Sequence, residues 1–120
     1  MAFDRRTFLK TLAAATASLA LQGARTRGEE PAGADRLGPL LPQRLLGSTG
    51  AWVTMLGVGG WHLGEISERD AQKTIEAALE GGIRFFDTAE MYQAGLSENR
   101  YGKWLVPKYR DLVFLMTKSA

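Results

Sequence analysis

Short apolar runs alternate with helix-forming segments over the second half of the chain, and this alternation limits the possible folds more than any other feature of the sequence. We interpret residues 54–58, 83–86 and 112–116 as strands because each is a brief and mainly apolar run. Between them, residues 67–80 and 97–105 carry apolar side chains at helical spacing. Strands that alternate with helices favour a parallel sheet with right-handed crossovers. The sequence therefore predicts an α/β fold.

Local signals mark the ends of several of these elements. Ser67 followed by Asp70 resembles a capping box, in which Ser67 accepts from a first-turn amide and Asp70 reaches back. The pair Gly81-Gly82 predicts a left-handed cap at the end of the same helix. Upstream, residues 44–46 and 51–53 flank a Gly-Ser-Thr-Gly turn, which predicts a β-hairpin with a four-residue loop. The expected order is a hairpin followed by β, α, β, α and β.

The composition excludes several kinds of site. A chain of 120 residues allows one small domain. It has no cysteine, so disulfides, thiol nucleophiles and thiolate metal sites are excluded. His62 is the only histidine, so we expect no metal centre and interpret His62 as a loop residue near the pocket. Residues 45–120 carry eight Lys or Arg against nine Asp or Glu, so we expect no nucleic-acid partner.

The first residues have the composition of an export signal. A charged start is followed by an apolar stretch that runs to about residue 24. Arg5-Arg6-Thr7-Phe8-Leu9-Lys10 resembles the twin-arginine export motif, so residues 4–24 are expected to engage the export machinery. Cleavage after Ala20 or after Ala24 remains open. The stretch is shorter than the roughly 20 apolar residues of a membrane span, so we expect an exported protein without a stable span, with anchoring by an uncleaved leader as the alternative.

Three regions follow from these patterns. Residues 1–24 are the expected signal peptide, and residues 25–43 are an expected flexible linker. Within the linker, residues 29–42 mix Gly, Pro, Ala and charge without periodicity, so we expect no regular structure there. Residues 44–120 form the expected folded body.

Three polar residues are expected to meet at one edge of the sheet. Asp87 ends the second predicted strand, Tyr92 lies in the loop that follows, and Lys118 ends the third. In a parallel α/β fold, reactive residues gather at the carboxyl ends of the strands. Adjacent strands lie about 4.8 Å apart, so Asp87 and Lys118 can form an ion pair.

This combination suits proton donation to a carbonyl group. A free tyrosine has a pKa of about 10, which makes it a weak acid near neutral pH. A nearby ammonium favours the phenolate and strengthens the acid. Asp87 would keep Lys118 charged and oriented, and Tyr92 would protonate an alkoxide as it forms. No side chain can store a hydride, so a dissociable cofactor must supply it.

The segment from Gly82-Ile83-Arg84-Phe85-Phe86-Asp87-Thr88-Ala89-Glu90-Met91-Tyr92 to Thr117-Lys118 resembles the aldo-keto reductase family, as do the hairpin and the run Leu56 to Trp61. The resemblance covers residues 44–120. It implies a (β/α)8 TIM barrel that reduces a small aldehyde or ketone with NADPH. It also implies that Tyr92 is the general acid, Lys118 its partner and Asp87 the orienting carboxylate. Gly60, Trp61 and Asp87 would contact the cofactor.

The chain departs from the family pattern in three respects. The family's active-site histidine follows the fourth strand and its main cofactor-phosphate site uses the last loops of the barrel, and the 120 residues end before both. Where the family usually has a Tyr-Gly pair, this sequence reads Tyr92-Gln93. We therefore expect only the hairpin and about three βα units of an incomplete barrel. The chain is expected to be an inactive fragment of a longer reductase. A non-catalytic nucleotide-sensing or partner-binding barrel and a non-functional truncated product remain the alternatives.

Overall fold

The computed structural model describes residues 33–119 of the chain. Three parallel strands form a sheet in the order β5–β6–β7. Their bounds are Gly57–Gly59 for β5, Phe85–Asp87 for β6 and Phe114–Met116 for β7. The register places Phe86 between Val58 and Leu115. The parallel α/β arrangement expected from the alternating pattern is thus confirmed.

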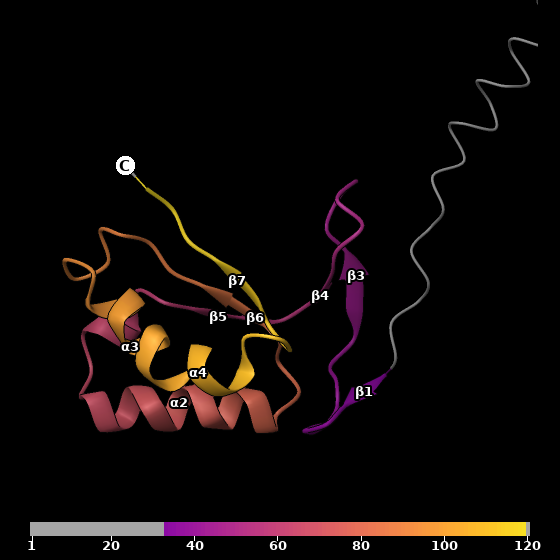
Figure 1. The fold of residues 1–120 in the computed structure, drawn as a ribbon, viewed down its shortest axis with the longest axis horizontal. Coiled ribbons are helices and arrows are strands. Elements are labelled where there is room, and N and C mark those ends of the chain that lie inside the picture. The colour runs from indigo at the N-terminus through magenta and orange to yellow at the C-terminus, as the bar shows by residue number, and fades with distance from the viewer. Residues whose placement is uncertain (1–32, 120) are drawn as a thin grey trace, which may run out of the picture. The chain divides into compact units, whose positions relative to one another are not determined.

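Three helices lie on one side of this sheet (Figure 1). They are α2 (Glu68–Glu80), α3 (Leu96–Trp104) and the short α4 (Val106–Tyr109). α2 connects β5 to β6, and α3 with α4 connects β6 to β7, so both parallel connections are helical crossovers. A single 3-10 turn, η1 (His62–Gly64), lies between β5 and α2. None of the helices between residues 33 and 119 is long and apolar enough to cross a membrane.

The hydrophobic core lies between the helices and the sheet. The Phe86 ring is fully buried and meets the buried Tyr101 ring edge-on, with the ring centroids 5.8 Å apart. The apolar stripe predicted for α2 is confirmed, because all its members are buried: Ala71, Ile75, Ala78 and Leu79. Side chains alternate along a strand, so Phe85 and Asp87 lie on the opposite face of β6 from Phe86. On that face, Phe85, Asp87 and Met116 line a groove of about 290 Å³.

The ends of α2 agree with the prediction in part. Ser67 is the N-cap, and its Oγ accepts from the Asp70 amide at 3.1 Å. The reciprocal half of the capping box is wrong, because the Asp70 carboxylate accepts from the Ser67 hydroxyl at 2.7 Å rather than from the backbone. Aspartate is one methylene shorter than the glutamate of a full capping box. At the other end, Gly82 has the left-handed φ of 84°, whereas Gly81 has a φ of −73°.

The predicted hairpin is confirmed as β3 (Gln43–Leu45) paired antiparallel with β4 (Trp52–Thr54). The Leu46 amide donates to the Ala51 carbonyl at 2.8 Å and closes the loop. The expectation that residues 54–58 form one strand is wrong. Thr54 ends β4 and its hydroxyl donates to the Leu56 carbonyl at 2.8 Å, which turns the chain before β5 begins.

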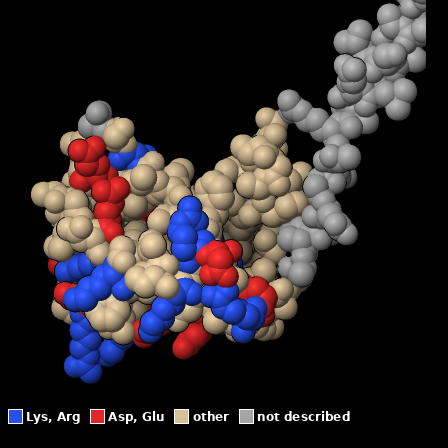
Figure 2. All heavy atoms as spheres, in the orientation of Figure 1, with Lys and Arg blue, Asp and Glu red and all other residues tan. Residues whose placement is uncertain are grey.

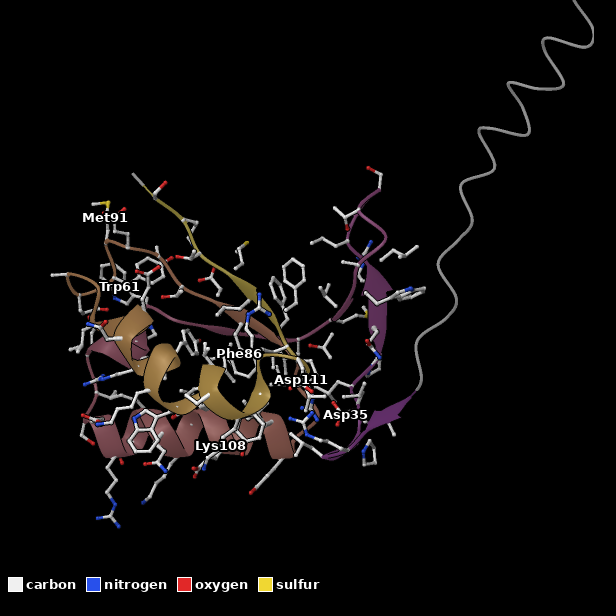
Figure 3. The ribbon with its side chains drawn as sticks, in the orientation of Figure 1. Asp35, Trp61, Phe86, Met91, Lys108 and Asp111 are labelled. Carbon is white, nitrogen blue, oxygen red and sulfur yellow. The ribbon has the colours of Figure 1, made fainter. Side chains whose placement is uncertain are left out.

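The expectation that residues 29–42 lack regular structure is wrong over residues 34–39. There, β1 (Ala34–Asp35) and β2 (Gly38–Pro39) form a small antiparallel pair. Asp35 accepts from the Arg84 Nε and Nη2 at 2.6 and 2.9 Å, and Arg36 pairs with Asp111. Figure 3 shows Asp35 and Asp111 at the end of the sheet opposite to Trp61 and Met91. Composition alone missed this segment because its partners are about 50 or more residues away.

The expected signal peptide and both of its cleavage sites lie outside the described residues. The division of the chain at residues 24 and 43 stays a prediction.

On the face drawn in Figure 2, the charged side chains gather over the helical side, while the hairpin surface is mostly uncharged.

Candidate active site

The structure brings Asp87 and Lys118 together at the carboxyl ends of β6 and β7. The Lys118 Nζ donates to the Asp87 Oδ2 at 2.5 Å and to the Thr88 carbonyl at 2.7 Å. The parallel register sets Asp87 opposite Met116, two residues before Lys118. The pKa of Lys118 is raised, first by the hydrogen bond to Asp87 and to a smaller extent by Tyr92, although partial desolvation opposes both.

Tyr92 lies beside this ion pair, in the loop between β6 and α3. The Lys118 Nζ is 5.1 Å from the centroid of the Tyr92 ring, a cation–π distance. The Tyr92 amide donates to the Ala89 carbonyl at 3.0 Å, and the Glu90 amide donates to the Lys118 carbonyl at 2.9 Å. The loop is therefore held against the end of β7, and the three residues proposed from the sequence share one corner of the sheet.

Trp61 packs against Tyr92 from the end of β5. The two rings meet edge-to-face at an interplanar angle of 75°, with centroids 5.2 Å apart. The Trp61 ring is about half exposed, and its Nε1 donates to the Glu65 Oε1 at 3.1 Å. Glu65 also contacts the His62 Nδ1 at 2.9 Å. The half-exposed face of the Trp61 ring therefore lies next to the phenol and the carboxylate–ammonium pair.

Gly60 is buried, and backbone packing explains why the position is a glycine. A Cβ atom there would lie 2.2 Å from the Asp87 carbonyl oxygen and 2.9 Å from the Ser97 Oγ. The ends of β5 and β6 can therefore approach each other only without a side chain at this position. Gly60 thus supports the arrangement of Trp61 and Asp87, and the segment that approaches its backbone is the end of β6.

The residues after Tyr92 adopt an uncommon backbone. Gln93 and Ala94 have positive φ values of 47° and 52°, and Gly95 follows with 84° as the N-cap of α3. Left-handed backbone costs about 1 kcal/mol or more per non-glycine residue. The backbone directly after Tyr92 therefore contains two consecutive strained residues.

Sequence reasoning missed the buried hydroxyl groups that connect these segments. Ser97 and Thr88 are both buried, and their hydroxyl oxygens lie 2.9 Å apart. The sequence marks Ser97 only as the first residue of the predicted helix 97–105, and Thr88 only as part of the segment 82–92. No sequence signal distinguishes a buried serine from an exposed one at a helix start. Over the described range there is no group of three His, Asp or Glu side chains that could hold a metal ion.

Comparison with known proteins identifies relatives of this arrangement. Residues 55–120 match the sequence profile described as the Aldo/keto reductase family. D-threo-aldose 1-dehydrogenase of a Pseudomonas species is 38% identical over 76 residues, which cover 60% of this chain and 23% of that protein. Pyridoxal 4-dehydrogenase of Microbacterium luteolum is 43% identical over 70 residues, which cover 55% of this chain and 20% of that protein. The chain spans less than a quarter of the length of these curated relatives.

A solved structure shares the fold of the described residues. The holo form of aldo-keto reductase AKR11C1 from Bacillus halodurans superposes with a TM-score of 0.60 and 36% sequence identity. The match covers 64% of this chain and 25% of that one. The expectation of the amino-terminal part of a (β/α)8 barrel is confirmed, and the strands between residues 33 and 119 form part of a barrel rather than a closed one.

Proposed function

This chain belongs to the aldo/keto reductase family, and on that premise we propose that the full-length protein interconverts an aldehyde or ketone and its alcohol, with NADPH as the hydride donor. The observation that carries the proposal is the position of the Lys118 Nζ, 2.5 Å from the Asp87 Oδ2 and 5.1 Å from the centroid of the Tyr92 ring. An ammonium, a carboxylate and a phenol at the same strand ends supply the groups that proton donation to a carbonyl oxygen would use.

In the proposed reaction, Tyr92 donates its hydroxyl proton to the carbonyl oxygen as negative charge develops there. The phenolate that remains is stabilised by the Lys118 ammonium, and Asp87 and the Thr88 carbonyl hold that ammonium in place. The proton and the hydride together convert the carbonyl group into an alcohol, and water returns a proton to Tyr92. A lysine is charged throughout the neutral range, and the raised pKa of Lys118 extends that charge to higher pH.

We propose that Trp61 and Asp87 adjoin the nicotinamide ring, and that Gly60 contributes by keeping the strand ends close. NADPH would supply the hydride, which no side chain can carry. The exposed part of the Trp61 indole offers an apolar surface for the ring, and its bond to Glu65 restrains its rotation. The names of two relatives describe dehydrogenases, so the assay should follow both the reductive and the oxidative direction.

Tyr92→Phe tests the proposal in the full-length protein. Removing the acid should lower kcat by about 10²-fold or more, while NADPH affinity measured by fluorescence titration stays within about threefold. Tyr101→Phe is the matched control, because it makes the same chemical change at a buried ring that packs on Phe86. Undiminished turnover in Tyr92→Phe would contradict the assignment. NADPH binding without turnover in the wild-type protein would favour the nucleotide-sensing alternative.

We also propose that residues 1–120 alone neither bind NADPH nor turn over substrate. The support is that no strand within the described residues pairs with the outer edge of β7, and that the groove at Phe85, Asp87 and Met116 is open. An unpaired edge of this kind favours aggregation over a stable site. Titration of the purified 120-residue chain with NADPH should show no saturable signal, and a saturable one would refute this proposal.

Export of the protein is a further proposal, and it is supported by Arg5-Arg6 and the apolar stretch after them. Replacing both arginines with lysine keeps the charge and should leave the protein in the cytoplasm with its leader attached. Cell fractionation and the mass of the recovered protein provide the measurement. An unchanged distribution would show that this pair does not direct export.

A further inference from the structure

Ser97 makes buried polar contacts with three segments of the site. A residue in the first turn of a helix does not need these contacts to begin the helix. It is the second residue of α3, and its side chain is fully buried. The Ser97 Oγ donates to the Gly60 carbonyl at 2.7 Å and lies 2.9 Å from the Thr88 Oγ1. The Ser97 amide donates to the Tyr92 carbonyl in a longer contact of 3.4 Å.

The direction of these hydrogen bonds follows from counting protons. A serine hydroxyl has one proton, and Ser97 gives it to the Gly60 carbonyl. The proton between the two hydroxyl groups must therefore come from Thr88. The result is a directed chain in which Thr88 donates to Ser97 and Ser97 donates to Gly60.

These two hydrogen bonds connect the three segments that carry the proposed site. Gly60 precedes Trp61, Thr88 follows Asp87 and accepts from Lys118 through its carbonyl, and the Ser97 amide contacts the loop at Tyr92. The space around these bonds is tight, because a Cβ on Gly60 would lie 2.9 Å from the Ser97 Oγ. The Ser97 hydroxyl therefore bonds directly to the residue that precedes Trp61, in a space with little room for either to shift.

We infer that Ser97 is a positioning residue of the proton-donating site. Its buried hydroxyl, oriented by Thr88, fixes the Gly60–Trp61 segment at the distance at which the Trp61 ring supports Tyr92 beside Lys118. The inference rests on the proposed function for its kinetic consequence only. Its structural content, that Ser97 holds Trp61 against Tyr92, is independent of any activity.

The kinetic test compares Ser97→Ala with Ser97→Thr in the full-length protein. Misplacement of a reacting group by about 1 Å can cost about 10²-fold in rate, so Ser97→Ala should lower kcat by up to that factor with little change in KM. Ser97→Thr retains the hydroxyl and should recover most of kcat. Thr54→Val is the control, because the Thr54 hydroxyl is equally buried and accepts from the Arg84 amide at 3.0 Å, at the other end of β6. It should lose stability and keep kcat.

The structural test measures Trp61 without relying on turnover. In the full-length protein with every tryptophan other than Trp61 replaced by phenylalanine, Trp52 and Trp104 among them, acrylamide quenching of Trp61 fluorescence should rise in Ser97→Ala and stay unchanged in Thr54→Val. If Ser97→Ala does not fold, Thr88→Val removes only the upstream donor and should give a smaller change of the same sign. Equal quenching in all variants, or a loss of stability in Ser97→Ala with kcat retained, would overturn the inference. A wild-type protein without reductase activity would refute the proposed function and leave the quenching result to decide on Ser97.

Discussion

The Lys118 ammonium and the Asp87 carboxylate meet at 2.5 Å because β6 and β7 are parallel neighbours whose carboxyl ends coincide. This contact is the largest cause of the raised pKa of Lys118, and Tyr92 adds to it. A raised pKa means that the ammonium persists to higher pH than in a free lysine. Asp87 therefore extends the pH range over which the charge beside Tyr92 persists.

Asp87→Asn should move the alkaline limb of the kcat/KM profile to lower pH. The substitution removes the hydrogen-bonded carboxylate that raises the Lys118 pKa, so Lys118 loses its proton earlier as the pH rises. A profile between pH 7 and 11 provides the measurement. Glu68→Gln is the control, because it removes the carboxylate from an exposed ion pair with Lys103 that joins α2 to α3. An alkaline limb that does not move in Asp87→Asn would show that Lys118 does not set it.

Gly60→Ala should destabilise the protein by about 3 kcal/mol or prevent folding, because the new methyl group would overlap a backbone oxygen that cannot move aside. Gly59→Ala should cost far less, since no atom lies within 4 Å of a Cβ at Gly59. Urea unfolding of the two variants provides the comparison. Similar stabilities would show that the strand ends are less closely packed than described.

Asp35→Asn should cost about 3 kcal/mol, because it leaves the buried Arg84 guanidinium without its carboxylate. The hydrogen bond from Arg84 is the main reason that the Asp35 pKa lies below its usual value. A lowered pKa contributes stability that is present above the unfolded pKa, about 3.9, and is lost as the pH falls through the lower folded value. The difference in the free energy of unfolding between wild type and Asp35→Asn should therefore narrow only as the pH falls into the acid range.

Asp111→Asn provides the control for Asp35→Asn. It makes the same substitution in the exposed pair with Arg36 and should cost much less than Asp35→Asn, because solvent screens an exposed ion pair. Denaturant unfolding at several pH values measures both variants. Equal costs at neutral pH would show that the segment before β3 does not stabilise the sheet.

Tyr101→Phe should leave the protein equally stable or raise its stability by up to about 1 kcal/mol. The Tyr101 hydroxyl is buried and has no hydrogen-bond partner among the described residues, and burial also raises its pKa. Removing an unsatisfied buried group recovers its desolvation cost. Thermal unfolding measures the effect, and a clear fall in Tm would indicate that the hydroxyl has a bound partner such as water.

The sequence alone predicted the elements whose causes are local. The start of α2 at Ser67 and its apolar stripe follow from residues within a few positions of one another. The placement of Asp87, Tyr92 and Lys118 also followed, because strand order and direction in a parallel sheet fix which ends coincide. The predicted strand ends were less accurate. Thr54 was expected to begin a strand but ends β4, and its hydroxyl accepts from the Arg84 amide, 30 residues away.

What the sequence by itself determined about this protein is the alternation of strands and helices, and with it the edge where the polar residues meet. Only the tertiary structure decided that Gly60 must lack a side chain, that Asp35 belongs to the folded body, and that Ser97 connects the strand ends. Each of these depends on an approach between segments distant in the chain, to 2.7 Å between the Ser97 Oγ and the Gly60 oxygen. Such distances are set by packing of the whole sheet against its helices, and no local pattern of residues specifies them.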